Sequence, residues 1–348
     1  MEGVSVIVCF YNAYGRLRET LQSIVDQDVI EGIDWEIIMV DNNSTDGAKD
    51  IVEEFKKVYE SKVSINYVFE PTPGLSNART AGFLYSHFEY LLFCDDDNLP
   101  AKEYVTLAYK LMHENNSIGM LGGKGFIDAR LKLPAWFDNV ETAYAVGNQY
   151  EHSGNITACK GYVWGAGMVM RRTAWQKVID NGFQGFLLTG RKSSSKSLAG
   201  EDTEMCILIQ NAGYEIHYSN QLEFIHAIPQ SRLNWDYYKS ICKGFAHAQI
   251  FVENYLLYFN NNEPGKYSNT LSEAFSKDLK IFLNGCFSLN YYKLMFLEFV
   301  RKRPGYTNGF QKRKYFDRIT GRIKFAKDLR NARKTISSNK KKNKVFLS

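Results

Sequence analysis

The sequence predicts an α/β fold in which helices flank a mostly parallel central sheet. Over the first hundred residues, short apolar runs alternate with amphipathic stretches, which is the pattern of βαβ units. The run from Tyr90 to Cys94 is almost continuously apolar, as a strand is when helices cover both faces of its sheet. A chain of 348 residues that is 45% apolar is also long enough to bury such a core.

The expected elements follow one another regularly. Strands are predicted at the apolar runs Val4 to Phe10, Trp35 to Val40, Ser64 to Phe69 and Tyr90 to Cys94. Between these strands, the apolar spacing is helical in three stretches, from about Arg16 to Asp26, Ala48 to Tyr59 and Asn77 to His87. This order of elements predicts that the first hundred residues form the parallel part of the sheet.

After Pro100 the pattern loosens into a second lobe. Glycine-rich stretches lie at Met120 to Gly125 and at Gly161 to Val169. The polar run from Thr189 to Ser197 lacks apolar periodicity, and we interpret it as a mobile loop. Helical spacing returns from Trp235 onward, but no stretch reaches 18 apolar residues, so no membrane span is expected.

The chain begins with Met1-Glu2-Gly3 and leads directly into the first strand, without the basic and apolar segments of a signal sequence. Its six cysteines show no paired short spacing, and Cys9 and Cys94 lie within apolar runs. We interpret them as buried thiols of a reducing compartment, which are neither a disulfide framework nor a zinc site. A cytoplasmic protein is therefore expected.

Charged residues are distributed unevenly along the chain. From Arg301 to Ser348 there are 17 Lys and Arg against two acids, a net charge of +15, which leaves residues 1–300 with a net charge of −10. In the basic segment, the apolar positions 315, 316, 319, 323 and 326 are spaced helically. This pattern predicts an amphipathic helix on an anionic membrane surface, although a nucleic-acid surface would attract the same charge.

Polar side chains follow each of the first four predicted strands. In an open α/β sheet, ligands bind beyond the carboxyl ends of the strands, so these residues are expected to converge on one site. They are Phe10-Tyr11-Asn12, Asp41 to Asp46, Glu70-Pro71 and Asp95 to Asn98. Asp41 stands where an acid can accept hydrogen bonds from a ribose hydroxyl or a base N–H, whereas Ser44 or Asp46 is expected to cap the next helix.

Three consecutive aspartates, Asp95, Asp96 and Asp97, end the apolar run from Leu91. A helix cap or a turn needs only one of them, and three neighbouring carboxylates repel one another unless a cation is present. Carboxylates together with phosphate oxygens are the ligands that Mg²⁺ or Mn²⁺ prefers. The cluster therefore predicts a divalent-metal site against a nucleotide diphosphate.

At this point the sequence resembles the family 2 glycosyltransferases of bacterial surface-polysaccharide synthesis, which have the GT-A fold. The resemblance covers about residues 3–230 and is carried by five motifs in the family's order: the first strand with Phe10-Tyr11-Asn12, the turn Val40 to Asp46, Gly74 to Arg79, the acidic cluster, and Gly200-Glu201-Asp202. It implies an inverting, metal-dependent transferase that moves a sugar from a nucleotide-diphosphate donor, expected to be UDP-linked, to a saccharide or lipid-linked acceptor.

The resemblance also implies roles for individual residues. Metal binding by Asp97 is implied, with Asp95 and His226 as further ligands of Mn²⁺ or Mg²⁺. Donor contacts are implied for Phe10, Asn12, Asp41, Glu70, Asn77, Arg79, Asp95, Asp96 and Arg232. The chain departs from the family pattern at Asn42, where a second aspartate is usual. A lone histidine at the end of an apolar stretch is more often structural, so both roles stay open for His226.

Sugar transfer with inversion needs a carboxylate that takes the proton of the attacking hydroxyl. By resemblance this base is Asp202, with Glu201 as the second choice, although acids in a first helical turn also favour the helix dipole. The acceptor wall is expected at Gly165, with Trp164 and Trp136 as sugar-stacking platforms. Core packing would explain the same residues.

The predicted organisation has a GT-A domain at residues 1–230, divided into a donor half (1–100) and an acceptor half (101–230). A helical extension (231–300) and the basic tail (301–348) follow. Two other function classes were weighed. A nucleotidyltransferase would want a glycine-rich phosphate loop after the first strand, which Phe10 to Gly15 does not provide. A non-enzymatic adaptor that binds a membrane or a nucleic acid would act through the basic tail. If the chain is a transferase, no nucleic-acid partner is expected.

Overall fold

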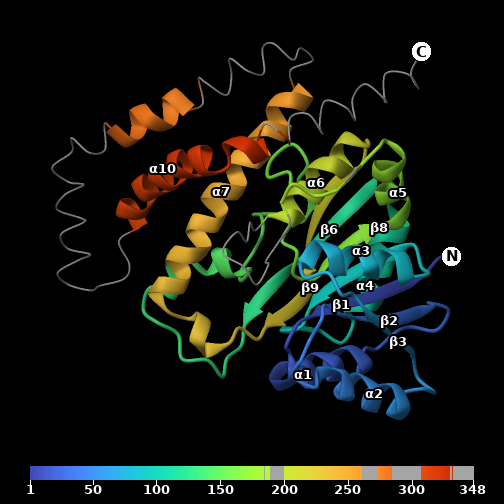
Figure 1. Ribbon diagram of the computed structural model, residues 1–348. Helices are drawn as coiled ribbons and strands as arrows, with labels where there is room; N and C mark the ends of the chain where they lie inside the picture. Colours follow the sequence, from blue (N-terminus) through green and yellow to red (C-terminus); the bar gives the residue numbers. More distant parts are fainter. Residues whose placement is uncertain are drawn as a thin grey trace, which may run out of the picture. The chain divides into compact units, whose positions relative to one another are not determined.

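The computed structural model describes residues 1–183, 185–188, 200–260, 273, 275–283, 307–329 and 331 (Figure 1). The chain divides into two compact units. The first comprises Met1–Leu131, Tyr144–Ser197 and Glu201–Ile228, and the second comprises Lys132–Ala143, Leu198–Gly200 and Pro229–Ser348. The polar run 189–197, interpreted above as a loop, lies outside the described residues.

A nine-stranded sheet forms the centre of the first unit, in the order β3-β2-β1-β4-β8-β6-β9-β5, with β7 paired to β9. Its parallel half consists of β1 (Val4–Phe10), β2 (Trp35–Asp41), β3 (Ser64–Phe69) and β4 (Tyr90–Asp95). These are the four strands that the sequence predicts, with β2 and β4 each one residue longer at the carboxyl end. The prediction of an α/β fold with a mostly parallel sheet flanked by helices is confirmed.

The other half of the sheet is mixed. It contains β5 (Asn98–Pro100), β6 (Ile118–Ile127), β7 (Gly154–Asn155), β8 (Met168–Arg171) and β9 (Glu215–His226). Strand β8 runs antiparallel to β4 and β6, whereas β6 and β9 are parallel. The glycines of β6 allow this close packing, because a Cβ at Gly125 would lie 2.0 Å from the carbonyl oxygen of Ala145.

Helices cover both faces of this sheet. Apolar residues of α1 (Tyr14–Val25), α2 (Ala48–Val58) and α4 (Tyr104–Glu114) form one core cluster with alternate residues of β1 and β4, and α1 and α2 lie side by side (Figure 1). On the other face, Gly82 of α3 (Leu75–Tyr85) packs against Ile7 and Val40. The alternation follows from the two-residue period of a strand. Two further helices are α5 (Arg172–Asp180) and α6 (Glu201–Asn211).

Five of the six cysteines are described, and all five are free thiols. Cys9, Cys94 and Cys206 are buried as expected, but Cys159 is exposed and Cys242 is partly exposed. The expectation of uniformly buried thiols is therefore wrong for Cys159, which lies in a loop. Among the described helices, none combines the length and apolarity that a membrane crossing requires.

The second unit contains α7 (Trp235–Asn260), helical residues 275–283 and α10 (Thr307–Lys324), with short 3₁₀ turns at Phe137–Asn139, Glu141–Tyr144 and Gln230–Arg232. A buried ionic network joins the three helices. Arg318 contacts Asp278 at 3.0 Å and Glu253 at 2.6 Å, and Arg322 contacts the same two acids. Two of the tail's arginines are thus neutralised inside the unit.

The helix that the tail's periodicity predicts is present, but part of its apolar face is exposed. Phe316 and Ile323 are 47% and 68% exposed, whereas Phe325 and Leu329 are buried. Leu279 and Leu283 of the neighbouring helical segment are also exposed, at 36% and 44%. The second unit therefore carries exposed apolar side chains on the helix predicted to be amphipathic.

Candidate active site

The register of the parallel strands brings three loops together at one edge of the sheet. Phe10 pairs with Asp41, and Cys9 pairs with Asp95, so the chain leaves β1, β2 and β4 at the same level. The predicted convergence of the strand ends is therefore present. Phe10 itself is only 2% exposed and belongs to the core, whereas the next aromatic residue, Tyr11, is 46% exposed at this edge.

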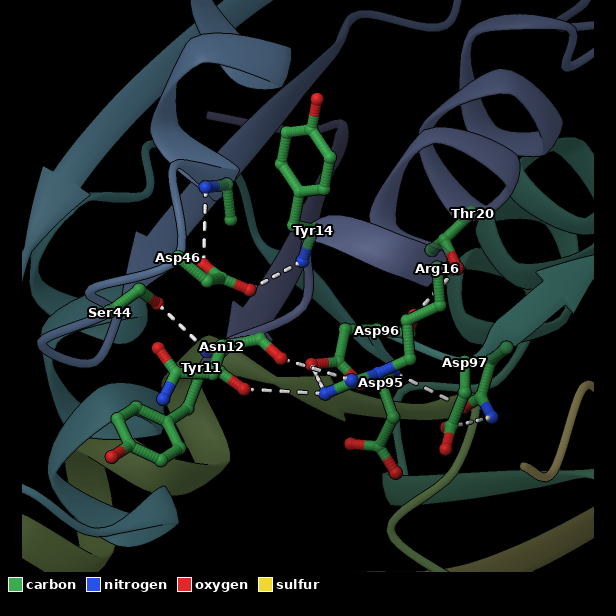
Figure 2. Close-up of polar contacts among 12 residues, drawn as sticks. Tyr11, Asn12, Tyr14, Arg16, Thr20, Ser44, Asp46, Asp95, Asp96 and Asp97 are labelled. Carbon is green, nitrogen blue, oxygen red and sulfur yellow. Dashed lines mark hydrogen bonds and ion pairs between the residues drawn. The ribbon is translucent and has the colours of Figure 1, made fainter. Parts of the chain in front are cut away.

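Asn12 ties the loop after β1 to the loop after β2 (Figure 2). Its φ of 47° lies in the left-handed region, which asparagine tolerates better than most residues. Its Oδ1 atom accepts a hydrogen bond from the Thr45 N–H at 2.8 Å, and its own N–H donates to Ser44 Oγ at 3.0 Å. The side chain of Asn12 is therefore engaged in shaping the loop that would face a nucleotide.

Asp41 is 3% exposed, and both of its carboxylate oxygens accept hydrogen bonds, from the Tyr67 hydroxyl at 2.8 Å and from the Ser44 N–H at 2.8 Å. The neighbouring Asn42 donates from Nδ2 to the Thr72 carbonyl at 2.8 Å and accepts at Oδ1 from the Gly74 N–H at 2.7 Å. An aspartate at position 42 could accept but not donate. This dual role explains the departure from the family pattern.

Glu70 and Asn77 shape the turn that leads into α3. The Oε1 atom of Glu70 accepts a hydrogen bond from the Thr72 N–H at 2.7 Å. Asn77 donates from Nδ2 to the carbonyls of Thr72 and Pro73, each at 3.3 Å. Both side chains thus have local partners at the edge where a nucleotide is expected.

The three aspartates have three different partners. Asp96 accepts two hydrogen bonds from the Arg16 guanidinium, at 2.8 and 2.6 Å. Burial raises the pKa of Asp96 to about 6, although these bonds from Arg16 oppose the shift. Asp95 lies 3.6 Å from the guanidinium of Arg79, and Asp97 lies 3.4 Å from the imidazole of His226. Figure 2 shows Arg16 reaching from α1 to this cluster.

His226 is placed by the antiparallel pairing of β5 and β9, in which it lies opposite Asn98. Its Nδ1 contacts the Tyr144 carbonyl at 2.7 Å, and its Nε2 faces Asp97. An Nδ1–H donated to a carbonyl leaves Nε2 with its lone pair toward Asp97, which is the arrangement of a metal-binding histidine. Burial, the largest single cause, acts to lower the pKa of His226, but Asp97, the Tyr144 carbonyl and Asp95 together raise that pKa above its ordinary value.

The residues present fit a divalent cation. Asp97 is buried and the side chain of His226 is 15% exposed, with polar atoms of the two residues facing each other at 3.4 Å. Asp95 lies two residues before Asp97, at the end of β4. Within the described part of the chain, no group of three or more metal-ligating side chains is already assembled. A cation held here would take its remaining ligands from phosphate oxygens and water, as Mg²⁺ commonly does.

Arg79 connects the acidic cluster to Glu201. The Arg79 side chain is 5% exposed, and its guanidinium lies 3.6 Å from Asp95 and 3.2 Å from Glu201 Oε1. The backbone of Gly165 comes so close that a Cβ there would lie 2.6 Å from Arg79 Nη2. A larger residue at position 165 would therefore have to displace the guanidinium, and the sequence did not distinguish this packing role from an acceptor wall.

Asp202 is fixed by two backbone donors. Its Oδ2 accepts from the Gly165 N–H at 2.9 Å, and its Oδ1 accepts from the Thr203 N–H at 2.7 Å in the first turn of α6. Glu201 is 4% exposed and bound to Arg79, whereas the neighbouring Asp202 is partly exposed. Of the two acids, Asp202 is therefore the more accessible to a substrate hydroxyl.

Two residues of this site carry no signal that marked them in the sequence. Arg16 was assigned only to the start of a helix, and Lys160 lies in an irregular loop. Burial lowers the pKa of Lys160 to about 8, although the nearby Asp202 acts in the opposite direction. The one clue that could have identified Arg16 is its place in the first turn of α1, the helix that follows the first strand.

The remaining predicted residues lie in different places. Trp164 adjoins Gly165, and its ring lies 5.0 Å below the Lys160 ammonium. Trp136 and Arg232 belong to the second unit. There, Trp136 is 5% exposed and packs against Trp235 and Tyr238, with ring centroids 5.4 and 5.8 Å apart.

Comparison with known families adds to this geometry. A family model described as glycosyl transferase family 2 matches residues 5–178. The chain belongs to this family. The prediction of a family 2 glycosyltransferase from five motifs is thereby confirmed, and with it the enzyme class at the level of the family. The alternatives of a nucleotidyltransferase and a non-enzymatic adaptor find no support in the match.

Several relatives of this family 2 chain are glycosyltransferases of Bacillus. The probable glycosyltransferase YdaM of Bacillus subtilis (strain 168) is 30% identical over 62% of this chain and 48% of its own length. The poly(ribitol-phosphate) β-glucosyltransferase of Bacillus spizizenii is 33% identical over 36% of this chain and 20% of its own length. The match thus covers less than half of the length of each of these relatives.

Solved structures share the fold. The mannosyltransferase PcManGT of Pyrobaculum calidifontis, in complex with GDP-Man and Mn²⁺, is 17% identical with a TM-score of 0.56, over 92% of this chain and 86% of that one. Residues 1–349 of S. aureus TarS, in complex with UDP-GlcNAc, give 17% identity and a TM-score of 0.51, over 97% and 92%. At this identity the likeness concerns the fold, and the expected GT-A fold is confirmed.

Proposed function

We propose that this family 2 chain is an inverting, metal-dependent glycosyltransferase that transfers a sugar from a nucleotide-diphosphate donor to a saccharide or lipid-linked acceptor in cell-surface glycan synthesis. The observation that carries the proposal is the Arg79 guanidinium, which lies within 3.6 Å of Asp95 and 3.2 Å of Glu201. This bridge brings the donor-side acidic cluster and the Glu201-Asp202 pair into one site.

The donor half of the site is the edge formed by the loops after β1, β2 and β3. Asn12, Asp41, Glu70 and Asn77 border this edge, and the exposed ring of Tyr11 offers a surface on which a base could stack. The carboxyl ends of parallel strands are the usual place for a nucleotide in such a sheet. UDP is the proposed nucleotide, and the UDP-GlcNAc complex of TarS is consistent with it.

Asp97 and His226, with Asp95, would hold Mn²⁺ or Mg²⁺. A bound cation of this kind supplies positive charge that stabilises the departing diphosphate. Arg16 neutralises Asp96 from the other side, so the net negative charge that the cluster presents to a diphosphate is reduced. The Mn²⁺ in PcManGT supports a metal in this fold.

The transfer itself follows from the position of Asp202. In the proposed step, Asp202 takes the proton of an acceptor hydroxyl while that oxygen attacks the anomeric carbon from the face opposite the diphosphate. The bond from the anomeric carbon to the diphosphate oxygen breaks, and the configuration at the anomeric carbon inverts. The N–H groups of Gly165 and Thr203 hold the carboxylate in place for this attack.

The direct test is a panel of nucleotide sugars, measured by thermal unfolding with and without Mn²⁺. A ligand that binds only the folded state at 100 times its Kd stabilises the protein by about 2.7 kcal/mol, which raises the Tm by several degrees. We expect one nucleotide class to give this shift and to require the metal. Absence of a shift with every member of the panel would contradict the proposed function.

We further propose that the second unit docks on an anionic membrane surface at the inner face of the cell membrane. Exposed Phe316 and Ile323 on α10, with exposed Lys314, Lys324 and Lys327, supply apolar and basic groups together. The buried arginines of the ionic network would not take part. Acceptors built on lipid carriers would be reached from such a surface.

The double variant Phe316→Glu/Ile323→Glu is expected to lose at least about tenfold in binding to phosphatidylglycerol vesicles, because two apolar contacts are removed and two negative charges are added. Vesicle co-sedimentation measures this. The matched control is Val58→Glu/Leu84→Glu, which changes exposed apolar residues of the first unit and should bind as the wild type does. Equal binding by both double variants would remove α10 from the proposed surface.

A further inference from the structure

The loop between β7 and β8 places a lysine beside the proposed base. The ammonium of Lys160 lies over the rings of Tyr162 and Trp164, 4.7 and 5.0 Å from their centroids. Its Nζ lies 3.5 Å from Gln149 Oε1. Tyr162 is 38% exposed, so this arrangement reaches the surface of the first unit.

A chain of hydrogen bonds connects Lys160 to Asp202 through Gln149 and the backbone of Trp164 and Gly165. The N–H of Trp164 donates to Gln149 Oε1 at 2.7 Å, and the next N–H along the chain, that of Gly165, donates to Asp202. The amide of Gln149 is in turn fixed by a bond from Nε2 to the Gly123 carbonyl at 2.7 Å. The ammonium and the carboxylate of the proposed base are therefore connected through Gln149 and two consecutive backbone N–H groups.

The charge of Lys160 has no close counterpart in the described part of the chain. None of the carboxylates described there forms an ion pair with it, and its recorded contacts are an amide oxygen and two ring faces. Ring faces attract a cation, but they satisfy none of its hydrogen-bond donors as an anion would. Burial correspondingly lowers the pKa of this lysine to about 8.

We propose that Lys160, Tyr162 and Trp164 form a subsite for an anionic group, a phosphate or a carboxylate, on the acceptor. The inference rests on the proposed function and specifies its acceptor class. The ammonium pairs with the anion, the aromatic rings cover the adjoining sugar, and the acceptor hydroxyl is thereby brought toward Asp202. In the proposed function the donor diphosphate would be bound elsewhere, at the strand edge where Arg16 pairs with Asp96 and Arg79 lies near Asp95.

The test uses the full chain with its donor site saturated by UDP and Mn²⁺, so that added anions cannot occupy the diphosphate position. Two matched pairs of small molecules are titrated by NMR: methyl β-D-glucuronide against methyl β-D-glucoside, and glycerol 1-phosphate against glycerol. We expect the anionic member of at least one pair to bind about tenfold more tightly or better at pH 7. The pair that shows the preference distinguishes a carboxylate from a phosphate.

Substitutions and pH connect this preference to Lys160. Lys160→Met is expected to abolish the preference, and Lys160→Arg to retain it. Because the ammonium is protonated below about pH 8 and neutral above it, the wild-type preference should fall as the pH rises through that value. In Lys160→Arg the preference should persist above pH 8, since the guanidinium stays charged.

Equal affinity for charged and neutral molecules, no detectable binding of either, or an unchanged preference in Lys160→Met would each overturn the subsite. The last result would leave Lys160 as a cation that only balances Asp202. UDP-induced thermal stabilisation is measured in the same samples. A wild-type protein that binds UDP without anion preference refutes the subsite alone, whereas one that binds no nucleotide refutes the proposed function as well.

Discussion

Asp202→Asn is expected to lower the rate of sugar transfer by about 10²- to 10⁴-fold, the range that a general base contributes. The substitution keeps the size of the side chain and one acceptor oxygen, but it removes the group that takes the proton. The donor site is formed by other elements, so UDP-sugar affinity should stay within about twofold of the wild type. Transfer rates and donor thermal shifts, measured on the same protein, test both expectations.

Asp180→Asn is the matched control, because Asp180 is an exposed acid of a helix in the same unit and hydrogen-bonds only Gln176 among the contacts recorded for it. Its transfer rate should equal that of the wild type. Glu201→Gln serves as a second comparison, since Glu201 is bound by Arg79 and acts on the site through that guanidinium. A wild-type rate in Asp202→Asn would remove Asp202 from the role of base.

The parallel half of the fold is the part that sequence pattern predicts best. β1 begins and ends where its apolar run does, because it is buried along its whole length between helices on both faces. β3 also has the predicted bounds, although it is the edge strand and only part of it is buried. The order of β8, β6 and β9 was not predictable, because it depends on contacts distant in sequence. Gly123 illustrates this: a Cβ there would lie 2.3 Å from the carbonyl of Leu222.

The location of the site was likewise predictable, but the partners within it were not. Strand ends converge by topology alone, so Asp41 and Asp95 were expected at one edge. The pairing of Arg16 with Asp96 joins residues 80 positions apart. The sequence near either residue does not indicate which residue it pairs with. The same limit holds for the tail, where periodicity predicted the helix but not that Arg318 and Arg322 would be buried against Asp278 and Glu253.

Asp97→Asn is expected to have an effect of similar size to that of Asp202→Asn, but through metal-dependent donor binding and not through proton transfer. Asp97 is buried and faces Nε2 of His226, so it is the aspartate best placed to hold a cation. An amide lacks the negative charge that Mn²⁺ favours in its ligands. We expect the Mn²⁺ concentration that supports UDP stabilisation to rise at least about tenfold, and transfer to fall by several orders of magnitude.

Asp96→Asn is the contrasting variant, because Asp96 is adjacent to Asp97 in the sequence but pairs with Arg16 instead of facing His226. Asp96 is bound by two hydrogen bonds from Arg16, and this pairing already neutralises it. Its loss should lower the Tm, since a partly buried guanidinium is left without its counter-charge, while the Mn²⁺ concentration required for UDP binding should change little. If Asp96→Asn shifted the Mn²⁺ requirement as far as Asp97→Asn does, the cation would be held by the whole acidic cluster and not chiefly by Asp97 and His226.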